Sequence, residues 1–168
     1  MLLVRGLWTL LDEDTKASRT ALREWLPPPV ELLRIAEYEC AWRVFALGAA
    51  HPALLCARLY GERLGGWEAA AEVADGVLSI EEFNPMVRIE AYRLLARARA
   101  ELADRAAACE AAGCAVAEAE LAEYAWLEML SLADALQWCE EGEAEGMRSQ
   151  LRDMAGRLAA TEDELVEV

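Results

Sequence analysis

The stretch of sequence that decides the fold is RIEAYRLLARARAELADRAAACEAAGCAVAEAE, residues 88–120. Its first part places apolar side chains, and its second part alanines, at the three- and four-residue spacing that lines one face of a helix. The recurring alanines are Ala108, Ala111, Ala112 and Ala115. We therefore expect two helices joined by a very short turn at Ala103-Asp104. Because alanine is small, the helices can approach closely, and the stretch predicts a tight antiparallel pair.

Further amphipathic segments, separated by turn residues, fill the rest of the chain. After Pro52, Gly65-Gly66 predicts a turn and Asn84-Pro85 a boundary between units. The acidic segment EEGEAEG, residues 140–146, predicts another turn. The other predicted helices cover about residues 2–11, 14–26, 30–47, 52–64, 67–78, 121–139 and 147–160. No segment alternates with a period of two over a strand's length, so the predicted fold class is all-α, with eight or nine helices.

The net charge of −15 is spread unevenly along the 168 residues. Residues 1–116 carry 17 acidic and 13 basic side chains, whereas residues 117–168 carry 14 acidic and 3 basic ones. A negative field repels phosphate backbones and anionic lipids, which disfavours nucleic acid as a partner and favours a protein with a basic surface. The alternative is that the acidic residues only keep an alanine-rich helical protein in solution.

The cysteine pattern and the apolar segments both bear on localisation. Five cysteines without a CxxC pair argue against a disulfide framework and favour the cytoplasm or another reducing intracellular compartment. The longest weakly charged windows, such as residues 40–55 with Arg43, are shorter than the about 20 residues that span a bilayer. Arg5 interrupts the apolar N-terminus, which we interpret as an amphipathic helix of the mature protein. We expect no insertion into a membrane.

Residues 52–160 resemble the tetratricopeptide-repeat (TPR) superfamily, whose helix pairs of about 34 residues carry a large residue at position 4 and small residues at positions 8, 20 and 27. With Ile89 as position 1, the matching residues are Tyr92, Ala96, Ala108 and Ala115. A step of 34 residues then places Trp126 at position 4 and Met129 at position 7 of the next unit. The resemblance implies antiparallel helix pairs in a short right-handed solenoid, with residues 1–50 packing on the repeats and residues 161–168 forming an acidic tail.

The resemblance also implies a concave groove, lined by the first helix of each pair, that binds a partner peptide or helix. In this register the groove residues are Arg58, Glu62, Glu90, Arg93, Arg97, Glu101, Tyr124 and Ser131. Arginines in a groove can hold a partner's carboxylates through paired hydrogen bonds. The alternative is that Arg93 and Arg97 pair within their own helix with Glu90 and Glu101.

Residue patterns for catalysis or for metal binding are scarce. His51 is the only histidine and lies at a helix boundary, where capping or solvent exposure is the simpler role. Cys109 and Cys114 are five residues apart, which points them to different helix faces and disfavours a zinc site. No Gly-rich phosphate loop occurs. We predict no catalytic, cofactor-binding or metal-binding residue.

These features predict a non-catalytic protein–protein interaction module, either an adaptor or an assembly scaffold. The alternative is a constitutive structural subunit of a larger complex. In that case apolar residues of the N-terminal helices, Leu3, Leu7 and Trp8 or Trp25, would form its docking face. The sequence specifies no oligomeric state.

Overall fold

The computed structural model describes residues 16–42, 52–80 and 84–166. Within these ranges the chain forms eight α-helices and no strand, so the protein is all-α as predicted. The helices are α2 (Lys16–Trp25), α3 (Pro29–Trp42), α4 (Pro52–Leu64), α5 (Trp67–Leu78), α6 (Pro85–Glu101), α7 (Arg105–Leu121), α8 (Ala125–Trp138) and α9 (Glu141–Val166). The helix predicted over residues 2–11 and His51 lie outside the described residues.

Local signals explain the boundaries of α6 and α7. The Asn84 side chain accepts a hydrogen bond from the backbone N–H of Met86 (2.8 Å), and Pro85 follows in the first turn, where a missing N–H costs nothing. The predicted turn at Ala103-Asp104 is confirmed. Ala103 adopts a left-handed φ of 63°, and the Asp104 carboxylate accepts a hydrogen bond from the N–H of Ala107 (3.1 Å).

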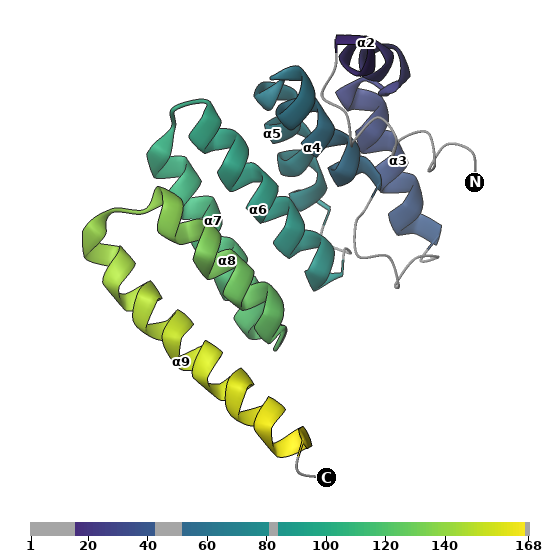
Figure 1. Ribbon diagram of the computed structural model, residues 1–168. Coiled ribbons are helices and arrows are strands. Elements are labelled where there is room, and N and C mark those ends of the chain that lie inside the picture. Colours follow the sequence, from purple (N-terminus) through teal and green to yellow (C-terminus); the bar gives the residue numbers. More distant parts are fainter. Residues whose placement is uncertain (1–15, 43–51, 81–83, 167–168) are drawn as a thin grey trace.

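Each helix from α3 to α9 packs against the next one along the chain, and three contacts skip a helix on one side of the molecule. These contacts join α2 to α4, α4 to α6 and α6 to α8, so that α4, α6 and α8 form a row (Figure 1). The contact between α3 and α5 joins helices on the other side of this row. The row places residues more than 30 positions apart next to one another, which is what creates the site described below.

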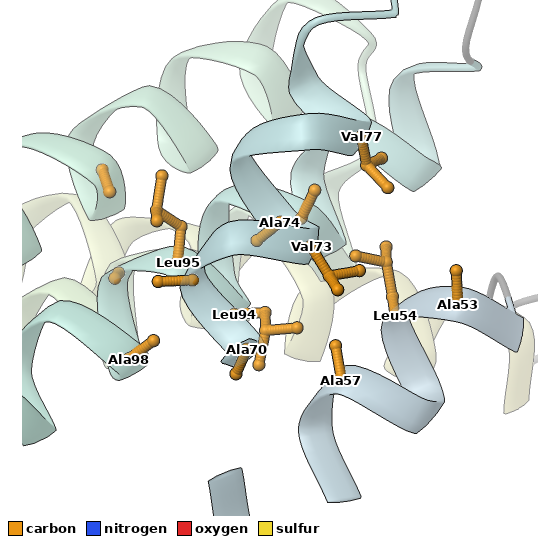
Figure 2. Packing of buried hydrophobic residues seen from close by; sticks show 14 of the residues in the cluster. Ala53, Leu54, Ala57, Ala70, Val73, Ala74, Val77, Leu94, Leu95 and Ala98 are labelled. Atoms are coloured by element: carbon orange, nitrogen blue, oxygen red, sulfur yellow. The ribbon is translucent and has the colours of Figure 1, made fainter. Parts of the chain in front are cut away.

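The core is built largely from alanine, as the opening stretch predicted. Ala108, Ala111, Ala112 and Ala115 of α7 are all buried. The close view in Figure 2 shows the equivalent packing of α4, α5 and α6, where small residues such as Ala57, Ala70 and Ala98 alternate with valine and leucine. One cluster of buried residues runs from Leu32 in α3 to Cys139 at the end of α8. The small side chains let the helix backbones approach closely, and the valine and leucine side chains fill the space that remains.

A second, smaller cluster attaches α2. Leu22, Leu26 and Leu59 are buried together, and Tyr60 packs against them. The Tyr60 hydroxyl donates a hydrogen bond to the carbonyl oxygen of Pro27 (2.8 Å). The proline-rich turn between α2 and α3 is therefore tied to α4 by one side chain.

The burial pattern corrects the 34-residue step. Ala70, Val73, Ala74 and Val77 of α5 are buried, and so are the residues 38 positions later, Ala108, Ala111, Ala112 and Ala115 of α7. Trp126, which the shorter step places at a packed position, is 65% exposed. The shorter step fails because α6 and α7 have 17 residues each. Together these two helices already take up 34 residues, so the turns between helices make the step longer than 34.

The start of α9 also differs from the prediction. Residues 141–146, expected to be part of a turn, belong to this helix, which continues to Val166 and includes most of the predicted acidic tail. Acidic residues at a helix N-terminus are stabilised by the helix dipole, and Ala144 is buried. The Glu141 carboxylate also accepts a hydrogen bond from Arg148 (2.8 Å), which lowers its pKa. The acidic run therefore favours a helix start here.

Cys109 and Cys139 form a disulfide, with Cα atoms 5.0 Å apart, which corrects the expectation of unpaired cysteines. Cys109 lies in α7 and Cys139 directly follows α8. Spacing in the sequence does not reveal this pair, because the packing of α7 against α8 brings the two residues together. Cys56 and Cys114 are free thiols.

Candidate partner-binding groove

Two adjoining depressions lie along the row of α4, α6 and α8. The first, of about 440 Å³, is lined by Arg58, Arg93 and Arg97 together with side chains from α8 that include Asp134 and Trp138. The second, of about 620 Å³, extends from Arg97 past α4 and α5 to α2. Arg97 and Glu101 line both depressions. The two therefore form one surface, which we call the arginine groove.

Six arginines line the arginine groove, against three lining carboxylates and Glu90, which pairs with Arg58 and Arg93. The arginines are Arg19, Arg23, Arg58, Arg63, Arg93 and Arg97, and the carboxylates are Glu62, Glu101 and Asp134. The groove therefore carries a local positive excess in a chain whose net charge is −15. Charge of one sign collected in a depression focuses the field on a ligand of the opposite sign.

Ion pairs between helices hold the groove arginines in place. Arg93 Nε donates to Asp134 of α8 (2.7 Å) and its Nη1 donates to Glu90 (2.9 Å). Glu90 in turn lies 3.6 Å from Arg58 of α4. This chain of charges crosses α4, α6 and α8, and Arg93 at its centre is only 15% exposed. Arg93 therefore links α6 to α8, and through Glu90 it is connected to Arg58 of α4.

Arg97 joins the two depressions. Its Nη1 donates to Glu62 of α4 (2.6 Å), and its guanidinium lies 5.3 Å from the centroid of the Trp67 ring. The contact with Trp67 adds a cation–π interaction to the ion pair. The Arg97 side chain stays 46% exposed, so it is fixed in direction and still open to solvent.

The structure brings together most of the residues predicted for the groove. Arg58, Arg93, Arg97 and Glu101 line the first depression, Glu62 lines the second, and Glu90 belongs to the same ion-pair chain. The predicted pairing of Arg93 with Glu90 within α6 is present. Arg97 pairs with Glu62 of another helix rather than with Glu101.

Ser131 and Tyr124 are the predicted groove residues that the structure places elsewhere. Ser131 is fully buried, and its hydroxyl has no hydrogen-bond partner among the described residues. Tyr124 precedes the first turn of α8 and lines neither depression. Both residues were predicted with a step of 34 residues. Because the step in the structure is longer, the prediction fell on residues outside the groove.

The α8 side of the groove consists of residues that the sequence analysis missed. Asp134 and Trp138 lie 37 positions after Arg97 and Glu101, which line the same depression from α6. The sequence contains a signal for this step of 37, because the buried residues of α6 have counterparts 37 positions later in α8. Leu94, Leu95 and Ala98 correspond to Ser131, Leu132 and Ala135. The arginines of α2 carry no such signal, because α2 precedes the repeated units.

Metal binding and thiol chemistry find little support in the described part of the chain. No group of three or more His, Cys, Asp or Glu residues there is arranged to hold a metal ion. Burial raises the pKa of the Cys56 thiol and, with the nearby carboxylates of Glu110 and Glu118, that of Cys114. Both cysteines are therefore poor nucleophiles, since the thiolate is the reactive form. None of the described helices is long and apolar enough to cross a membrane.

Comparison with protein-family models, with curated proteins and with solved structures gives no match to this chain.

Proposed function

We propose that this protein is a non-catalytic interaction module, an adaptor or assembly scaffold, that binds a segment of a partner protein in the arginine groove. The observation that carries the proposal is the pair of half-exposed arginines, Arg58 and Arg97, held over a depression that crosses successive helices. Charged side chains that are fixed in place lose little entropy when a ligand binds, which favours recognition.

The arrangement of helices supports a TPR-like, right-handed solenoid of antiparallel pairs as the framework of this module. In such solenoids each helix pair contacts its neighbours, and the row of first helices forms the binding surface. The contacts from α4 to α6 and from α6 to α8, and the recurrence of buried residues between α5 and α7, agree with this proposal.

A capture experiment with matched variants tests the proposal. Arg58→Gln with Arg97→Gln removes two groove charges, and Arg148→Gln with Arg152→Gln removes two charges from α9 outside the groove. We expect a partner protein to be captured from cell extract by the wild type and the α9 variant, and lost with the groove variant. Equal capture by both variants would contradict a role for the groove.

The alternative function is that of a permanent subunit of a larger complex, and exposed apolar residues favour it. Trp25 is 57% exposed, and Leu121, the last residue of α7, is 84% exposed. Leu3, Leu7 and Trp8, the other residues predicted for such a docking face, lie outside the described residues. Size-exclusion chromatography with light scattering separates the two functions, because a stable monomer favours the adaptor and obligate association favours the subunit.

We further propose that the partner presents a basic surface to the acidic residues 117–168. We also propose that the protein works in the cytoplasm or another reducing compartment. The free thiols of Cys56 and Cys114 agree with such a compartment, whereas a Cys109–Cys139 disulfide that persists in the cell speaks against it. Rapid alkylation of cell extracts tests it. Thiols at Cys109 and Cys139 in the cell agree with a reducing compartment, and a disulfide there contradicts it.

A further inference from the structure

We infer that the arginine groove binds an extended acidic peptide segment, whose carboxylates are held by Arg58 and Arg97. The inference rests on the proposed function and names the chemistry of the bound segment. Three properties of the groove carry it: the charge excess, the donors that the arginines leave open, and the length of the surface.

The charge excess is specific to the groove. The chain contains 15 arginines and a single lysine, and six of the arginines line this one surface. Arginine binds a carboxylate through two parallel hydrogen bonds, whereas lysine acts as a point charge. An arginine-lined surface therefore matches carboxylates better than it matches neutral or basic side chains.

The accessible arginines retain donors for a ligand. Within the described part of the chain, Arg97 contacts Glu62 through Nη1 alone, which leaves its Nε–H and its second amino group for a further carboxylate. Arg58 is 42% exposed and lies 3.6 Å from Glu90, too far for a strong hydrogen bond. A ligand can therefore add contacts to these two arginines while the ion pairs that hold them stay in place.

The length of the groove fits an extended segment. The groove runs from α2 across α4 and α6 to α8, which is three helix spacings. At about 8–10 Å per spacing this is roughly 24–30 Å, the length of about eight extended residues. Trp67 and Trp138 are partly buried and form part of the walls of the two depressions.

The charge outside the groove disfavours nucleic acid as the ligand. Residues 117–168 carry 14 acidic and 3 basic side chains, and they include α8 and α9 next to the end of the groove. A long polyanion leaving the groove would meet this field, whereas a short acidic peptide would not. We therefore favour the peptide and use an oligonucleotide as a competing ligand in the test.

The test measures binding of the full chain to a ten-residue peptide that alternates glutamate and alanine, by isothermal calorimetry at low salt. We expect a counterpart with glutamine in place of glutamate to bind at least roughly tenfold more weakly, because hydrogen bonds to charged groups are lost. Arg58→Gln with Arg97→Gln should weaken binding of the acidic peptide by a similar factor. Arg148→Gln with Arg152→Gln should leave binding within about twofold, because exposed ion pairs outside the groove contribute little to it.

Several results would overturn the inference. These are no binding of the acidic peptide, equal binding of the glutamine peptide, an equal loss in both double variants, or tighter binding of a ten-nucleotide oligothymidine. The comparison of the two peptides uses only the wild type, so it decides the matter even if the groove variant does not fold. If a captured partner depends on the groove but binds through a segment without acidic residues, the inference fails and the proposed function stands.

Discussion

Breaking the disulfide between Cys109 and Cys139 is expected to remove a large share of the stability of this protein. The bond joins residues 30 positions apart, and chain entropy assigns about 3.6 kcal/mol to a loop of that length. Small proteins are stable by only about 5–15 kcal/mol. The same corner of the molecule retains the hydrogen bond from Arg105 Nε to the carbonyl oxygen of Trp138 (2.9 Å), so α7 and α8 should stay in contact after reduction.

Urea unfolding followed by far-UV circular dichroism measures this loss. With an m value of about 2 kcal/mol per M, reduction should lower the midpoint by roughly 1.8 M. Cys109→Ala with Cys139→Ala should lower it similarly and abolish the response to dithiothreitol. The matched control, Cys56→Ala with Cys114→Ala, removes the free thiols of these two residues and should keep that response.

A digest under non-reducing conditions verifies the pairing independently. A glutamate-specific protease is needed, because residues 106–147 contain no lysine or arginine, whereas Glu110 separates Cys109 from Cys114. Fragments linked through Cys114 instead of Cys109 would contradict the pairing. If the correctly linked protein unfolds at the same urea concentration before and after reduction, the disulfide does not stabilise the fold.

Two further predictions concern α4 and the alanine-rich helix α7. Gly61→Ala should destabilise the protein by about 1–3 kcal/mol, because the added Cβ would overlap the Trp67 ring. Gly113→Ala should stabilise it by about 0.5–1 kcal/mol, because its helical site is open. Chemical denaturation of both variants measures the two effects, and equal effects would contradict this prediction. Tyr60→Phe should cost about 1 kcal/mol near neutral pH through loss of the hydrogen bond to Pro27. Burial raises the pKa of Tyr60 above the ordinary tyrosine value of about 10, so its stabilising contribution is present below that pH and is lost as pH rises through the folded pKa. The Phe variant should therefore lose less stability than the wild type in alkaline solution, and parallel pH profiles would show that Tyr60 does not contribute in this way.

The features of the fold that the sequence predicts depend on short-range chemistry. The alanine face of α7, the turn at Ala103 and the glycine turn before α5 each follow from residues within a few positions of one another. The break between α7 and α8 carries no Gly or Pro signal. It is made at Glu123, which adopts a left-handed φ of 57°. The disulfide was missed for a related reason, since only the packing of helices brings its two cysteines together.

The contacts of the candidate site also divide into those visible from sequence spacing and those that depend on helix packing. Arg93 and Glu90 pair at three-residue spacing, so their contact is visible in the sequence. Glu62 and Arg97 are 35 residues apart, and their pairing depends on where α4 and α6 cross. A step of 37 residues makes the acidic Asp134 the α8 residue that corresponds to Arg97, whereas a step of 34 makes it the buried Ser131. On an arginine-rich surface such an error alters the charge of the predicted neighbours, and hence the ligand that the surface is expected to bind. The charge of a groove between repeats can therefore be assigned only after burial has fixed the step of the repeat.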